Sequence, residues 1–82
     1  MILDKAITER IFKLCYERGI TPNKLARMAG MPSGSLKSIF YGKSKNVGTR
    51  TILDICQALG ISLYDFFNDD LFKSSELEGR YW

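Results

Sequence analysis

The chain has 82 residues, 45% hydrophobic and 26% charged, which suits one small folded domain and leaves no room for a second. It has no histidine, and its two cysteines, Cys15 and Cys56, have no CxxC spacing, so Ser-His-Asp and Cys-His catalysis and the usual metal-binding patterns are excluded. The net charge of +3, with an isoelectric point near 9.0, hints at an anionic partner.

The first two expected helices lie in the first thirty residues. The apolar residues of the first helix recur three and four positions apart: Leu3, Ile7, Ile11, Leu14 and Cys15. Gly19 ends that helix as a C-terminal cap. Thr21 is suited to the N-cap of a second helix and Pro22 to its first turn, so we expect a short helix from Pro22 to about Ala29, closed by Gly30.

A third helix is expected over residues 33–41, from Ser33 to Tyr41, after a turn that contains Gly30. Leu36, Ile39 and Phe40 are its expected core residues. Residues 43–48 show no helical period and predict a basic polar loop.

Two more helices complete the expected fold. One covers Thr49–Leu59 and is closed by Gly60, and a short one covers Leu63–Phe67, with Ser62 as its N-cap. Phe66 and Phe67 are both expected to be buried. Nothing alternates as a strand, so we predict an all-α fold of five helices, with a domain over residues 1–69 and a tail over residues 70–82.

The charges are unevenly distributed along the chain. Residues 21–50 contain six basic residues and no acidic one, a net charge of +6, whereas residues 51–82 have a net charge of −4. A surface built from the first of these stretches attracts polyanions. The alternative interpretation is a solvated face on which the charges segregate by chance.

Two short helices joined by a tight glycine-containing turn are the helix-turn-helix signature, in which the second helix enters the major groove of DNA. The stretch from Arg18 to Phe67 resembles the lambda-repressor-like, Cro/CI-type (XRE) helix-turn-helix family. The segments that carry the resemblance are RGITPNKLARMAG, MPSGSLKSIFYGKSKN and TILDICQALGISLYDFF. The resemblance implies a five-helix lambda-repressor-like domain that binds double-stranded DNA.

The resemblance also implies roles for individual residues. Four residues of the recognition helix would face base edges: Ser33, Gly34, Lys37 and Ser38. Nine residues would lie along the phosphate backbone: Thr21, Asn23, Lys24, Arg27, Tyr41, Lys43, Ser44, Lys45 and Asn46. Thr21 would also cap the first helix of the motif, as in the family.

The sequence departs from the family pattern at three places. Pro22 replaces a glutamine that often contacts DNA, and the leading recognition positions are the short Ser33 and Gly34, so shape and backbone contacts gain weight. Many members pair an arginine late in the first helix with a glutamate late in the recognition helix. The matching positions are Cys15 and Phe40, so we predict an apolar contact in place of that ion pair.

These features favour a sequence-specific transcriptional regulator, repressor-like, from a phage, a bacterial chromosome or a toxin–antitoxin pair. The alternative is a protein-interaction module, or an antitoxin component, with the same fold. We predict that the chain is not an enzyme and needs no cofactor, metal or small-molecule ligand. No apolar run is long enough for a membrane helix and no signal peptide is evident, so we expect a cytoplasmic protein.

The tail has two interpretations: it folds back on its own core as a flap, or it forms part of a dimer contact. We favour a homodimer, because two copies that read two half-sites gain affinity.

Overall fold

The computed structural model describes residues 3–32, 34, 36 and 47–73. These residues form four α-helices and a 3-10 turn: α1 (Leu3–Arg18), α2 (Pro22–Met28), α4 (Thr49–Leu59), α5 (Leu63–Phe67) and η1 (Asp70–Phe72). The described part of the chain contains no strand, which confirms the all-α class. The third predicted helix, over residues 33–41, lies mostly outside the described residues. Within the same residues, no helix is both long and apolar enough to cross a lipid bilayer.

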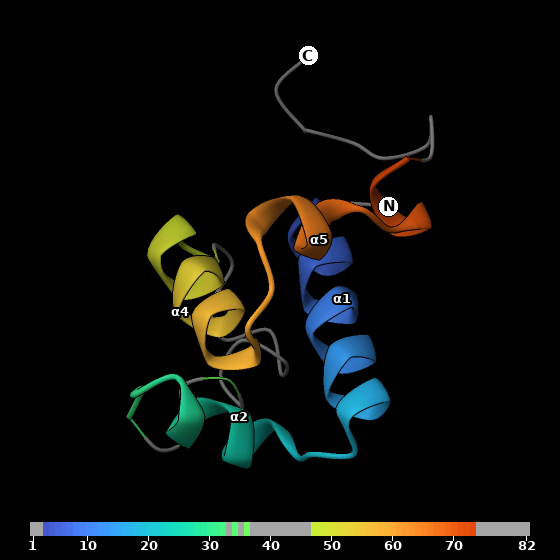
Figure 1. Ribbon diagram of the computed structural model, residues 1–82. Helices are drawn as coiled ribbons and strands as arrows, with labels where there is room; N and C mark the ends of the chain where they lie inside the picture. Colours follow the sequence, from blue (N-terminus) through green and yellow to red (C-terminus); the bar gives the residue numbers. More distant parts are fainter. Residues whose placement is uncertain (1–2, 33, 35, 37–46, 74–82) are drawn as a thin grey trace.

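The helices enclose one core (Figure 1). α5 and η1 lie beside the first half of α1, and α2 lies at the opposite end of the molecule, where α1 ends. The largest fully buried side chains come from every part of the fold: Phe66, Ile11, Leu25, Leu36, Ile55 and Cys56. The predicted inward face of α1 is confirmed at its four central positions, whereas Leu3, at the first turn, is 40% exposed.

α1 and α4 end in the same way, at the two predicted glycines. Gly19 and Gly60 have φ values of 64° and 70°, a left-handed conformation that glycine adopts without strain. After each glycine, an isoleucine N–H donates back to the helix: Ile20 to the carbonyl of Cys15 and Ile61 to that of Cys56, both at 3.0 Å. Both isoleucines then pack against the core, so each glycine turn also fixes where the next segment begins.

α5 begins at its predicted N-cap, Ser62, which also forms a capping box with Asp65. The Ser62 hydroxyl accepts from the Asp65 N–H at 3.0 Å, and the Asp65 carboxylate accepts from the Ser62 N–H at 3.3 Å. Phe66 is fully buried, but the prediction that Phe67 is buried too was wrong, because 37% of Phe67 is exposed. Neighbouring residues of a helix point about 100° apart, so one short helix cannot bury both rings in the same core.

Candidate nucleic-acid interface

The N-terminus of α2 is fixed by its own sequence. The Thr21 hydroxyl accepts from the Lys24 N–H at 3.1 Å, which satisfies a donor that the first turn of a helix leaves free. Pro22 follows in the first turn, where the absence of its N–H breaks no helical bond. The predicted cap is therefore confirmed, and it sets the position at which the polar face of α2 starts.

α2 has a buried face and an exposed face. Leu25 and Ala26 are 0% and 1% exposed and attach the helix to the core. Asn23, Lys24 and Arg27 are exposed, and the two cations lie three residues apart on one face of the helix. Neither cation forms an ion pair with any residue that the structure describes. Their charges therefore remain available to an anionic partner.

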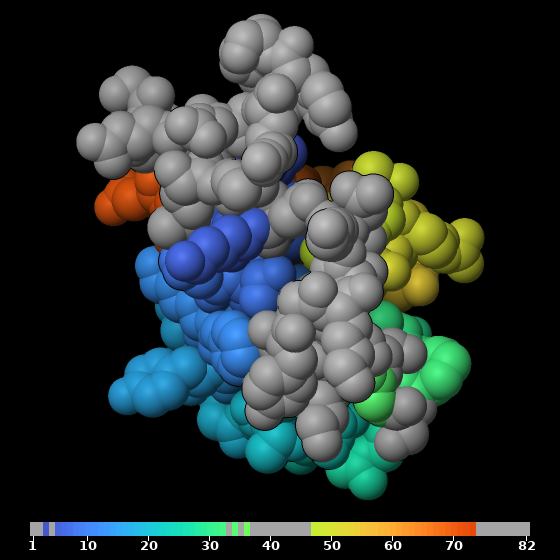
Figure 2. All heavy atoms as spheres, turned by 180° about the vertical axis from the view of Figure 1, so that it is seen from behind, coloured from blue at the N-terminus to red at the C-terminus, as the bar shows by residue number. Residues whose placement is uncertain are grey.

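The space-filling view in Figure 2 places this surface on the whole molecule. The atoms of α2 and of the turn that follows it form one end of the molecule, below those of α1 and α4. The exposed cations of α2 therefore belong to a terminal surface, which a long, rod-like ligand can reach without a cleft.

The turn after α2 is tight, as a helix-turn-helix requires. Gly30 N–H donates to the Arg27 carbonyl at 3.1 Å and Met31 N–H to the Ala26 carbonyl at 2.9 Å. α2 itself ends at Met28, one residue before the predicted end at Ala29. These bonds direct the chain away from α2 within a few residues, toward the segment expected to read DNA.

The start of the predicted recognition helix needs a correction. Gly34 lies in a turn with φ of 86°, whereas helical residues have φ near −63°, so no α-helix runs from Ser33 through Gly34. Leu36, by contrast, is helical and fully buried, as predicted. Gly34 therefore lies in a turn and not in a helix, and Leu36 is the helical residue that the structure describes in this segment.

The other predicted contact residues fall outside the described part of the chain. They are Ser33, Lys37 and Ser38 among the base contacts, and Tyr41, Lys43, Ser44, Lys45 and Asn46 among the backbone contacts. The same holds for Phe40, the predicted partner of Cys15, whereas Cys15 itself is buried in the core.

Two other cations near the motif have protein partners. Arg50 pairs with Asp54, with 3.2 Å between Nε and Oδ1, and Figure 1 shows that α4 begins on the side of the molecule away from α2. Arg18 donates from Nη2 to the Leu59 carbonyl at 2.9 Å and so joins the ends of α1 and α4. The structure describes three basic residues in the acid-free stretch, residues 21–50. Arg50 forms an ion pair, whereas Lys24 and Arg27 form none with any described residue.

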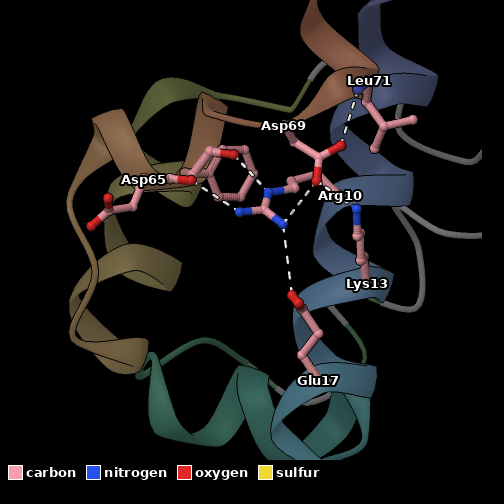
Figure 3. A network of polar contacts seen from close by, with 7 residues as sticks. Arg10, Lys13, Glu17, Asp65, Asp69 and Leu71 are labelled. Atoms are coloured by element: carbon pink, nitrogen blue, oxygen red, sulfur yellow. Dashed lines mark hydrogen bonds and ion pairs between the residues drawn. The ribbon is translucent and has the colours of Figure 1, made fainter.

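A buried polar cluster lies near the other end of the molecule, and the sequence did not predict it (Figure 3). Arg10 is only 8% exposed, and its guanidinium donates to the carbonyls of Phe66 (2.7 Å) and Asp65 (2.9 Å) and to the Asp69 carboxylate (3.3 Å). Lys13 donates to the same carboxylate at 2.7 Å. A usable signal existed: Arg10 lies three residues after Ile7 and four before Leu14, within the apolar stripe of α1.

The cluster shifts the acid–base equilibria of its members. A backbone hydrogen bond from the Leu71 N–H, together with the hydrogen bond from Lys13, holds the pKa of Asp69 below its usual value. The bond to Asp69 raises the pKa of Lys13 in turn. Both groups are therefore charged at neutral pH, as an ion pair requires.

The two cysteines behave as core residues, as predicted. Cys15 and Cys56 are 3% and 1% exposed, and burial raises the pKa of each thiol. No group of three or more acidic, cysteine or histidine side chains among the described residues is placed to hold a metal ion.

Comparison with known families agrees with this geometry. A family model described as the Cro/C1-type HTH DNA-binding domain matches residues 10–70, which include α2, its turn, α4 and α5. No match to the chain was found among curated proteins or among solved structures. The match covers most of the chain. It includes the helix-turn-helix motif, in which α2 carries the unpaired cations Lys24 and Arg27. The chain therefore belongs to the Cro/C1-type helix-turn-helix DNA-binding domain family.

Proposed function

We propose that the protein is a sequence-specific, DNA-binding transcriptional regulator of the repressor type that acts in the cytoplasm. The observation that supports this proposal best is the exposed face of α2, where Lys24 and Arg27 have no carboxylate partner among the described residues. Such a face attracts the phosphate backbone, and in this family it lies beside the helix that enters the major groove.

In this proposal, two sets of residues contact DNA. Asn23, Lys24 and Arg27 of α2, with the cap residue Thr21, follow one phosphate strand. The basic segment after the recognition helix follows the other flank: Tyr41, Lys43, Ser44, Lys45 and Asn46. Bases are read by Ser33, Lys37 and Ser38, and the turn at Gly34 brings the backbone close to the groove.

We further propose that the protein acts as a homodimer and that residues 70–82 contribute to the contact between the two copies. The exposed apolar side chains of α5 support this: Leu63 is 47% exposed, Tyr64 75% and Phe67 37%. They lie on the segment that leads into the tail, away from α2 (Figure 1). A pair of copies can then reach two half-sites about one helical turn of DNA apart.

Selection of duplexes from a random pool at low salt tests the proposal. We expect one sequence, with two related half-sites, to be enriched. Lys37→Ala should change which sequence is preferred, whereas Lys43→Ala and Lys45→Ala should weaken binding to all sequences about equally. If no sequence is enriched, the regulator proposal fails and a protein-interaction module becomes the better account of the fold.

A further inference from the structure

The ends of α1 and α4 are built alike. Residues 18–20 end α1 and residues 59–61 end α4, and each segment contains a left-handed glycine followed by an isoleucine that packs against the core. A helix N-cap comes directly after each segment, Thr21 for α2 and Ser62 for α5. The way in which each helix ends therefore determines where the next helix begins.

One side chain connects these two ends. Arg18 donates from Nη2 to the Leu59 carbonyl at 2.9 Å, and the two residues are 41 positions apart in the sequence. Gly60 and Ile61 donate back to earlier carbonyls of α4, whereas the Leu59 carbonyl lies in the last turn, where a helix supplies no donor of its own. α4 also has no basic residue in its last turn. The cation that a helix C-terminus favours is thus supplied by α1.

This bond lies close to the start of α2. Thr21, whose hydroxyl caps α2, comes three residues after Arg18. α2 packs against both α1 and α4 (Figure 1) and has only two buried side chains of its own, Leu25 and Ala26. The direction of so short a helix depends on how the two longer helices are held together. Contacts to phosphates require cations in a fixed register, so this direction matters for DNA binding.

We propose that Arg18 is a positioning residue for DNA binding, which holds the end of α4 to the end of α1 and so fixes the direction of α2. The Arg18 cation itself stays on the protein, because its guanidinium lies at the C-terminal ends of two helices, and both ends attract a cation. This inference rests on the DNA binding of the proposed function and adds a residue that lies outside the two helices of the motif.

The experiment compares Arg18→Met with Lys5→Met in the full chain. Both changes remove one exposed cation from α1 and lower the net charge equally, but Lys5 lies in the first turn of α1, at the other end from Arg18. The selected duplex is titrated with each variant at several salt concentrations, at a temperature at which circular dichroism shows both variants to be folded. Arg18→Lys keeps a cation and a donor near the Leu59 carbonyl, so it tests rescue and serves if Arg18→Met does not fold.

We expect Arg18→Met to bind DNA about fivefold more weakly than Lys5→Met. The slope of log K against log salt should be the same in both variants, because no phosphate contact is lost. Arg18→Lys should recover part of the affinity. Hydrogen exchange at the Ile61 amide, just after the end of α4, should accelerate about threefold or more in Arg18→Met, whereas exchange at the Phe66 amide should match the wild type.

Three results would overturn the proposal. Equal DNA affinities of Arg18→Met and Lys5→Met would show that only net charge matters. A salt slope smaller by about 1 in Arg18→Met than in Lys5→Met would show that Arg18 contacts a phosphate directly. An unchanged exchange rate at Ile61 would show that the bond does not hold the end of α4.

The outcome for the proposed function is separate. If the wild type binds no duplex, DNA binding fails and the role of Arg18 fails with it. If the wild type binds a selected duplex and the two variants bind it equally, only the role of Arg18 fails.

Discussion

The two ends of this molecule use the same residue type for opposite purposes. At the α2 end, Arg27 is exposed and has no acidic partner among the described residues. At the α5 end, Arg10 is 8% exposed, and its guanidinium bonds to two carbonyls and to Asp69. The comparison teaches that a count of basic residues does not show which cations an anionic partner can reach, because some of them are already paired within the protein.

The physical difference between the two arginines is the cost of removing each from water. A buried cation is tolerated only when hydrogen bonds and an opposite charge replace its hydration, and it is then committed to the fold. An exposed cation keeps its hydration and its counterions, and the release of counterions drives its binding to phosphates. Arg27 can exchange water for DNA, whereas Arg10 cannot leave its partners without destabilising the fold.

The largest expected effect comes from replacing each of these arginines by methionine. Arg10→Met should lower the free energy of unfolding by about 3 kcal/mol, because two helix-end carbonyls lose their donor and Asp69 keeps only Lys13 as a cationic partner. Arg27→Met should change it by less than about 0.5 kcal/mol, as exposed substitutions generally do. Urea denaturation of both variants measures the difference. Similar stability losses in the two variants would remove the distinction between the two ends.

A smaller effect is expected from acid, through Asp69. Its pKa is depressed in the folded chain, so its contribution to stability is present above the pKa of the unfolded chain and is lost as pH falls below about 4. The charged and titratable groups near Asp69 come from three helices: Arg10, Lys13 and Glu17 from α1, Cys56 from α4 and Asp65 from α5.

Asp69→Asn should therefore cost about 2 kcal/mol at neutral pH and less in acid, so that wild-type and variant stabilities converge as pH falls. Denaturation series at several pH values provide the measurement. A stability gap that stays constant down to the lowest pH at which the fold survives would contradict the role given to the Asp69 charge.

The smallest effect concerns the two helix caps, one at each end. Thr21→Ala and Ser62→Ala should each lower the free energy of unfolding by about 1 kcal/mol, because each leaves a first-turn N–H without its acceptor. Only Thr21→Ala should also weaken DNA binding, since it alone loosens the start of α2. Thermal unfolding and titration with duplex DNA measure both variants. Weaker DNA binding by Ser62→Ala alone would contradict the assignment of DNA binding to the α2 end.

The local sequence accounts well for the helix ends. Thr21, Ser62 and the glycines at positions 19 and 60 act through bonds to residues within five positions, so short patterns are sufficient to predict them. The bounds of α4 and α5 follow the prediction for the same reason. The exposed face of α2 was also predictable, because the Thr21 cap sets the start of the helix and the apolar Leu25 and Ala26 mark its buried side.

The features that the sequence did not predict depend on distant partners. The position of Arg10 in the apolar stripe of α1 signals burial, but its partner Asp69, 59 residues away, is placed beside it only by α5 and η1. Phe67 is apolar like its neighbour Phe66, and only the orientation of α5 on the core decides which ring is buried. Gly34 fits a helix start by sequence, whereas its positive φ places it in the preceding turn.

The salt dependence of DNA binding is the most direct test of the central claim, that the unpaired cations of α2 contact phosphates. The selected duplex is titrated at several salt concentrations with the wild type, with Lys24→Ala/Arg27→Ala and with Lys13→Ala, whose cation already pairs with Asp69. The account predicts that the double variant lowers the slope of log K against log salt by about 2 and that Lys13→Ala leaves it unchanged. An unchanged slope in the double variant would contradict it.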